Sequence, residues 1–297
     1  MSAITIMGEG AWGRALGFVA RKNGHNVSFW SRRNPVFPPS TDAFIIAVPS
    51  QHVREVLAHV PLGDTALISA AKGIERGSGK LMAEVMAETK PRAEHYALSG
   101  PSFAADVVSG LPTAVALAGP TLEKAMAWAE RLGTSHFRVY ATDDLRGVEI
   151  GGAMKNVLAI ACGICAGQGL GESARASLVT RGFAELSRYA RAHGARTETL
   201  MGLSGIGDLI LTCASSKSRN YAFGLAIGQA QTVPDALAAA TGVVEGAYTA
   251  GIAAALAEQS GIEMPIIAAV ARIVGGHSTP HHEITKLLAR PLRPENE

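Results

Sequence analysis

Short apolar runs alternate with longer segments of helical periodicity through the first half of the chain. The runs have the length and the β-branched and aromatic content of buried strands. They cover residues 4–7, 26–30, 43–48, 65–69, 95–98, 113–117 and 137–140. This alternation predicts an α/β fold with a doubly wound sheet. In such sheets ligands gather at the carboxyl ends of the strands, which directs attention to Pro49-Ser50, Lys72-Gly73 and 100–102, although each could be ordinary turn chemistry.

The pattern changes near Leu145, where long alanine-rich segments with helical spacing replace the strand signals. These segments cover residues 153–166, 173–194, 219–230, 234–241, 246–260 and 264–275. They predict an all-α helical second domain. The best boundary is the segment 142–145, which gives a dinucleotide-binding domain over 1–144 and a helical substrate and dimerisation domain over 145–297.

A glycine loop follows the first apolar run, with Gly8, Gly10 and Gly13 spaced as Gly-x-Gly-x-x-Gly before a helical segment. Gly8 permits a tight turn, Gly10 removes a Cβ that would block a pyrophosphate, and Gly13 lets the helix approach the strand. The amides at the start of that helix would then face the phosphates. The context predicts a Rossmann-like dinucleotide site, with an ordinary tight turn as the alternative.

The second strand run ends in Ser31-Arg32-Arg33, at the position that distinguishes the two nicotinamide cofactors. An acidic residue there suits the ribose 2′-hydroxyl of NAD, whereas arginine suits a 2′-phosphate. NADP(H) is therefore favoured and NAD(H) remains possible. Alternatively, Arg32 and Arg33 are solvated charges at a strand end.

Composition narrows the class of protein further. The chain has 297 residues and a formal net charge of +2, with basic residues too scattered for a nucleic-acid or membrane-surface partner. No apolar run approaches the roughly 18 residues of a membrane helix, and no secretory signal opens the sequence. The cytoplasm is the expected compartment.

The cysteines and histidines suggest no metal site. Cys162, Cys165 and Cys213 lie in apolar surroundings and are expected to be small buried hydrophobic residues rather than a redox or metal pair. The nine histidines form no ligand pattern. His281-His282 is expected in an exposed turn of the tail.

Three polar islands interrupt the helical half. Lys155 lies on a face of small side chains, where desolvation could lower its pKa until it exchanges a proton near neutrality; it could also snorkel to water. Asp208 follows the glycine-rich segment 202–207 at a helix start, where capping alone could explain it. Ser218 is a candidate N-cap, and Arg219 in the following first turn indicates that an anion such as phosphate is expected.

Taken together, these segments resemble bacterial NAD(P)-dependent glycerol-3-phosphate dehydrogenases over nearly the whole chain. The resemblance is carried by Gly8–Gly13, Ala47–Ser50, Ala71–Gly73, Ser99–Ala104, Gly152–Asn156, Gly207–Leu209, Ser218–Asn220 and Val243–Gly246, in the family's order. It implies reversible reduction of dihydroxyacetone phosphate to sn-glycerol 3-phosphate for phospholipid synthesis, by a cytoplasmic homodimer that needs no metal.

The resemblance also assigns roles to residues. Lys155 would exchange the proton at the substrate's C2 oxygen, with Asp208 and Lys72 as further catalytic residues. Substrate contacts would be Lys72, Gly100, Ser102, Lys155, Asp208, Ser218, Arg219 and Asn220. Cofactor contacts would be Gly8, Gly10, Ala11, Trp12, Gly13, Arg32, Arg33, Lys72, Ala104, Arg219, Val243 and Glu245.

Two features depart from the family pattern. The segment 34–42 is shorter than its counterpart in the family, and Glu9 replaces a small neutral residue between the first two glycines. A carboxylate at that position must point away from the pyrophosphate. Two rival functions stay open: a related dehydrogenase acting on a β-hydroxy acid, and a catalytically silent NADP-binding sensor.

Overall fold

The computed structural model describes residues 1–61, 65–292 and 294. Seven strands form one sheet in the order β2-β1-β3-β4-β5-β6-β7. The strands are β1 (Ala3–Met7), β2 (Asn26–Trp30), β3 (Ala43–Ile46), β4 (Ala66–Ser69), β5 (Glu94–Ser99), β6 (Thr113–Ala118) and β7 (Phe137–Thr142). All neighbours are parallel except β5 and β6, which are antiparallel. The predicted doubly wound sheet therefore contains one antiparallel pair, which the sequence pattern did not indicate.

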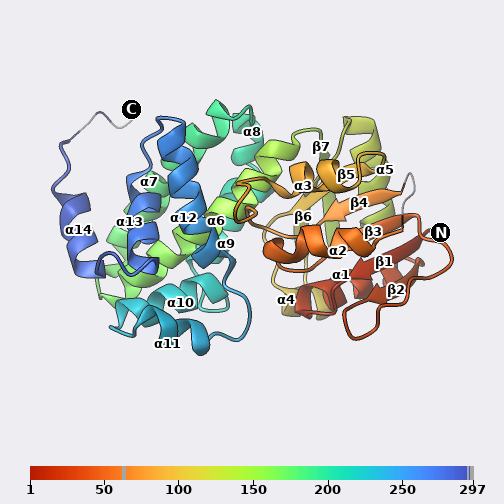
Figure 1. Ribbon diagram of the computed structural model, residues 1–297, viewed down its shortest axis with the longest axis horizontal. Helices are drawn as coiled ribbons and strands as arrows, with labels where there is room; N and C mark the ends of the chain where they lie inside the picture. The colour runs from red at the N-terminus through yellow and green to blue at the C-terminus, as the bar shows by residue number, and fades with distance from the viewer. Residues whose placement is uncertain (62–64, 293, 295–297) are drawn as a thin grey trace.

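Helices cover both faces of this sheet, as a doubly wound fold requires (Figure 1). Apolar side chains of α1 (Ala11–Lys22), α4 (Ala104–Val108) and α5 (Leu122–Leu132) pack on one face. Those of α2 (Val53–His59) and α3 (Met82–Thr89) pack on the other. Strand residues alternate between the two cores, as Phe44 and Ile45 do on β3. The predicted α/β class is confirmed.

The remainder of the described chain, beyond Leu145, is helical (Figure 1). Its elements are α6 (Leu145–Gly167), α7 (Gly171–Ala192), α8 (Thr197–Leu200), the π-helical turn η2 (Leu203–Gly207), α9 (Asp208–Cys213), α10 (Arg219–Gly228), α11 (Val233–Ala238), α12 (Glu245–Gln259), α13 (Pro265–Val274) and α14 (Pro280–Leu288). The expectation that His281 and His282 lie in a turn is wrong. They are exposed, but Thr279 caps α14 by accepting a bond from the His282 amide, so both belong to its first turn.

Helix α6 is the central element of the helical part. Its length and composition would allow it to cross a membrane, contrary to the expectation from the apolar runs, but 89% of its most apolar window is buried inside the protein. The side chain of Asp144 caps it by accepting a hydrogen bond of 2.8 Å from the Gly147 amide. The second carboxylate oxygen of Asp144 accepts one from the Arg196 amide. The start of α6 is therefore fixed directly after β7.

Helices α6 and α10 pack with their backbones almost in contact, because each carries glycines on the facing side. A Cβ on Gly163 would lie 2.1 Å from the carbonyl oxygen of Tyr221, and one on Gly224 would lie 2.1 Å from that of Ile160. No side chain can occupy either position without moving a helix. This close approach sets the positions of the side chains at the start of α10.

Replacing Gly224 by Ala should separate α6 from α10 and lower the free energy of unfolding by about 2 kcal/mol or more. Urea denaturation would measure the loss. Gly251→Ala is the matched control, since a Cβ there meets nothing within 4 Å in the exposed face of α12. The control should be stabilised by about 0.5–1 kcal/mol, as helical propensity predicts. Equal effects of the two changes would contradict the account of the α6 and α10 contact.

Candidate functional site

The glycine loop between β1 and α1 has the shape of a phosphate cradle. Gly8 adopts a φ of +111°, and a Cβ on Gly13 would lie 2.0 Å from the carbonyl oxygen of Gly8. A Cβ on Gly10 would meet nothing within 4 Å, so the space above it is open. No side chain caps the start of α1. Open space before an uncapped helix start fits the pyrophosphate of a dinucleotide.

A cavity of about 360 Å³ extends from this loop along the ends of β1, β2 and β3. The loop is joined to the end of β2 by a 2.9 Å hydrogen bond from the Gly8 amide to the Trp30 carbonyl. Among the side chains that line the cavity are Arg32, Arg33 and Glu9. Its size and position fit the adenosine half of a dinucleotide.

Two charged groups of this cavity, Arg32 and Glu9, already have partners within the protein. The exposed Arg32 guanidinium binds the carboxylate of Glu55 at 2.6 Å. The Glu9 carboxylate accepts a hydrogen bond of 3.2 Å from the Ser31 hydroxyl. Glu9 thus turns toward the end of β2 rather than over the glycines.

A second group of charges lies between the sheet and the helical part. Lys72, which follows β4, donates from Nζ to Asp208 Oδ2 at 2.7 Å and to the Gly100 carbonyl at 3.0 Å. Lys155 Nζ of α6 is 3.0 Å from Asp208 Oδ1. Asp208 is 2% exposed and Lys155 is 6% exposed, so water screens this cluster little. The Lys155 side chain therefore does not snorkel to water. The Asp208 carboxylate binds the two lysines rather than capping α9.

Burial and neighbouring charges set the protonation of the cluster. Burial lowers the pKa of Lys155 to about 8, although the Asp208 carboxylate opposes this shift and Lys72 adds to it. Burial alone would raise the pKa of Asp208, but the two ammonium groups outweigh it and leave that pKa below its ordinary value. The site therefore holds a permanent carboxylate beside an amine that can gain or lose a proton near neutral pH.

Thr212 completes the surroundings of Lys155. Its hydroxyl accepts a 2.7 Å hydrogen bond from Lys155 Nζ and donates one of 3.2 Å to Asp208 Oδ1. The residue is one helical turn beyond Asp208 on α9, so the two side chains share a face. Sequence reasoning missed Thr212, and this spacing of four residues was the available signal.

A chain of amides connects the cluster to the starts of α10 and α12. Asn156 Nδ2 donates to the Lys72 carbonyl at 3.2 Å, and Asn156 Oδ1 accepts from Asn220 Nδ2 at 2.9 Å. Asn220 Oδ1 in turn accepts from the Gly246 amide. The sequence placed Asn156 in a motif without a role. Because its side chain uses both polar atoms in this chain, it positions Lys72 relative to α10.

Glu245 joins α12 to the sheet. Its carboxylate accepts bonds from the amide and hydroxyl of Ser50, which follows β3, at 2.8 and 2.5 Å. Burial raises the pKa of Glu245, and these hydrogen bonds together with the charge of Arg219 oppose that shift. The sequence identified the position of Ser50 but did not predict this contact.

The first turn of α10 also contributes to this region. Ser218 caps the helix by accepting a bond from the Tyr221 amide, as predicted. Among the described residues, no carboxylate lies within ion-pair distance of the exposed Arg219 guanidinium, which lies against Gly242. Ser102 lies next to Lys72, since its hydroxyl also donates to the Gly100 carbonyl. Ala104 opens α4, and Val243 is half-buried just before α12.

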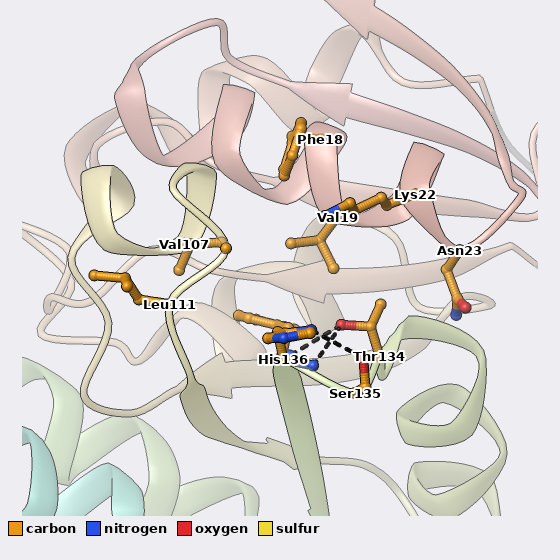
Figure 2. A pocket seen from close by; sticks show the side chains of 11 residues that line it. Phe18, Val19, Lys22, Asn23, Val107, Leu111, Thr134, Ser135 and His136 are labelled. Carbon is orange, nitrogen blue, oxygen red and sulfur yellow. Dashed lines mark hydrogen bonds between the residues drawn. The ribbon is translucent and has the colours of Figure 1, made fainter.

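Two other cavities contain none of the predicted site residues. One of about 410 Å³ lies between α1, α4 and the start of β7, where Phe18, Val107 and Leu111 face Thr134 and His136 (Figure 2). Another, of about 1070 Å³, lies between α7, α13 and α14 and is mainly apolar.

Cys162, Cys165 and Cys213 are buried and free, as predicted. No group of three or more metal-ligating side chains occurs in the part of the chain that the structure describes.

The sheet with its glycine loop, the helical part and the buried lysine cluster between them define a two-part nicotinamide-dependent dehydrogenase. Residues 3–38 and 39–125 match the N-terminus of the NAD-dependent glycerol-3-phosphate dehydrogenase family, and residues 144–285 match its C-terminus. The chain belongs to this family.

Individual relatives agree with this assignment. Proteins named glycerol-3-phosphate dehydrogenase (NAD(P)+) from Bradyrhizobium sp. and Methylobacterium radiotolerans are each 48% identical to this chain, covering 98% and 99% of it and 98% of their own lengths. The crystal structure of glycerol-3-phosphate dehydrogenase from Coxiella burnetii is 36% identical and superposes with a TM-score of 0.91, over 97% of this chain and 99% of that one. D-mandelate dehydrogenase, at 14% identity and a TM-score of 0.63, shares the fold alone.

Replacing Asp208 by Asn should leave two ammonium groups without their shared carboxylate in a buried site. The expected loss is about 3 kcal/mol of unfolding free energy at pH 7, measured by urea denaturation. Adding Lys155→Met removes one of the unpaired charges, so the double variant should lose less than the sum of the single changes. Strict additivity would show that the two side chains do not interact in solution.

Proposed function

We propose that the protein catalyses the reversible, NAD(P)H-dependent reduction of dihydroxyacetone phosphate to sn-glycerol 3-phosphate. The observation that carries the proposal is the buried Lys155, held by Asp208 and Thr212 with its pKa lowered to about 8 by burial. The names of the closely similar relatives support the assignment of this substrate. The proposed units are the dinucleotide-binding domain 1–144 and the substrate domain 145–297.

Lys155 is the proposed proton donor and acceptor. In the reducing direction its ammonium Nζ stabilises the negative charge that develops on the ketone oxygen and then donates a proton to it. Asp208 holds that ammonium in place through the 3.0 Å contact and keeps it charged in a buried site. A bound nicotinamide cofactor supplies the hydride. In the opposite direction neutral Lys155 accepts the proton of the substrate's hydroxyl.

The remaining substrate contacts are proposed for the phosphate and the carbon chain. Arg219 at the start of α10 offers a guanidinium with no carboxylate at ion-pair distance among the described residues, so a phosphate can take both of its donor edges. Ser218 and Asn220 flank it. Lys72, Gly100 and Ser102, which follow β4 and β5, are the proposed contacts from the sheet. The phosphate would thus distinguish this substrate from a β-hydroxy acid.

The cofactor is proposed to lie along the strand ends, from the adenosine cavity to Glu245. Gly8, Gly10, Ala11, Trp12 and Gly13 would hold the pyrophosphate, with Lys72, Ala104, Arg219, Val243 and Glu245 nearer the nicotinamide. Arg32 and Arg33 would bind a 2′-phosphate and favour NADP(H). The Arg32 pair with Glu55 is an exposed one, with both side chains more than half accessible, so exchanging it for a phosphate costs little.

The proposal also covers the compartment, the metabolic role and the oligomeric state of the enzyme. It places the protein in the cytoplasm, without nucleic-acid or membrane partners, in the supply of glycerol phosphate for phospholipid synthesis. A homodimer is proposed as well. The apolar cavity between α7, α13 and α14 supports this assembly, because exposed Leu170, Leu288 and Leu292 line it and a second copy would cover them.

The purified protein should oxidise NADPH and NADH when dihydroxyacetone phosphate is added, as followed by absorbance at the nicotinamide band. Dihydroxyacetone without the phosphate should give at least about a hundredfold lower kcat/KM, because Arg219 then has no anion to bind. Turnover of a β-hydroxy acid in its place would indicate the related dehydrogenase. Binding of the cofactor with no turnover of either substrate would indicate a sensor.

The pH dependence should report the titration of Lys155. Reduction needs the ammonium, so kcat/KM for the ketone should fall as pH rises through about 8, whereas the reverse reaction needs the amine and should rise over the same interval. Lys155→Met should abolish both limbs and lower kcat by about a thousandfold or more, with cofactor binding retained. Lys286→Met, at an exposed position on α14, is the control. An unchanged profile in Lys155→Met would refute the assignment.

A further inference from the structure

The adenosine cavity contains an acidic side chain that the proposed function does not use. Glu9 lies between the first two glycines of the loop, and its carboxylate accepts a 3.2 Å hydrogen bond from the hydroxyl of Ser31. Ser31 is the residue directly after β2. The loop cannot move far from this strand end, because the Gly8 amide is bonded to the Trp30 carbonyl. The carboxylate is therefore held where β2 ends.

The end of β2 is where dinucleotide folds distinguish the two cofactors. An acidic residue carried by β2 usually binds the ribose 2′-hydroxyl of NAD, and an arginine there binds the 2′-phosphate of NADP. Here β2 is followed by Ser31, Arg32 and Arg33, with no acidic residue. The carboxylate reaches the same place from the glycine loop instead. The cavity thus combines the acidic group typical of one cofactor with the basic groups typical of the other.

The charges of this cavity oppose one another. Glu9, Arg32 and Arg33 all line it, and Arg32 is bound to Glu55 at 2.6 Å. A 2′-phosphate entering here would gain from the two guanidinium groups but would lie near the Glu9 carboxylate and displace Glu55. A 2′-hydroxyl can donate a hydrogen bond to a carboxylate and meets no repulsion.

We propose that Glu9 is a specificity-determining residue that acts against the 2′-phosphate and for the 2′-hydroxyl. It keeps the preference given by Arg32 small, so that both NADPH and NADH serve the enzyme. This inference rests on the proposed function, since it concerns the cofactor of that reaction. Discrimination here results from a repulsive element as well as an attractive one.

Binding measurements separate this role from a structural one. Isothermal titration calorimetry of the whole protein would give the Kd of NADPH, NADH, adenosine 2′,5′-bisphosphate and 5′-AMP. Glu9→Gln keeps the shape and the ability to accept from Ser31 but removes the charge. Ser31→Ala removes the hydrogen bond but keeps the charge. Glu130→Gln, an exposed carboxylate on α5, is the control for net charge.

Glu9→Gln should tighten NADPH binding and weaken NADH binding, so that the ratio of the two Kd values shifts by about tenfold toward NADPH. The two adenosine fragments should shift in the same sense. Arg32→Ala should move the ratio by a similar factor toward NADH. Glu130→Gln should leave the ratio within about twofold, and added salt should reduce the effect of Glu9→Gln. Ser31→Ala, which frees the carboxylate from the end of β2, should shift the ratio in the same direction as Glu9→Gln but by less.

An equal change of both Kd values in Glu9→Gln would overturn the proposal and give Glu9 a purely structural role in the loop. A shift of the same size in Glu130→Gln would also overturn it, because net charge would then explain the result. Binding of neither dinucleotide to the unchanged protein would contradict the proposed function itself. The two failures are therefore distinguishable.

Discussion

Two ammonium groups share one buried carboxylate at the junction of the sheet and the helical part, and the site depends on this arrangement. Moving ions from water into a protein costs several kcal/mol each unless close partners compensate. Asp208 compensates both Lys72 and Lys155 at 2.7 and 3.0 Å, and Thr212 satisfies a further donor of Lys155. Three separate segments must therefore be in place before any of these charges is stable. The same ion pairs hold the charges of the site in place and join the sheet to the helical part.

Helix α6 delivers Lys155 to that junction and also forms the core of the helical part. Its glycines allow α10 to approach until backbone atoms nearly touch, which places Asn220 next to Asn156. The hydrogen bonds of Asn156 then extend this order to the Lys72 carbonyl. The packing of the small residues and the hydrogen bonds of Asn156 together fix the position of α10 relative to Lys72. A longer side chain in the α6 and α10 contact would displace the end of α10 that carries Arg219, the residue proposed to bind the phosphate, as well as lower stability.

The sequence was sufficient to predict the strands of the sheet, because buried parallel strands form continuous apolar runs bounded by turn residues. It also located Lys155 and Asp208, whose polar character interrupts apolar surroundings. It could not show which of these side chains meet, since Lys72, Lys155 and Asp208 are far apart in the chain and only the docking of the two parts joins them. The antiparallel β5 and β6 pair was missed because its runs read like those of the parallel strands. The Ser50 and Glu245 contact was missed for the same reason as the cluster, since it joins residues 195 positions apart.

The two ends of the site differ in how their charges are solvated, and this difference separates the proposed chemistry from the proposed cofactor selectivity. The lysine cluster is buried, so each of its charges strongly affects the others, and a change there disturbs both stability and the protonation of Lys155. The charges at the end of β2 are more exposed, with Arg32 and Glu55 each more than half accessible in their side chains. Water screens such charges, so each contributes little to stability but can still change the relative affinity of two ligands that differ by a phosphate. The role proposed for Glu9 therefore concerns cofactor preference alone, and a change of this residue should leave the buried cluster and the fold the same.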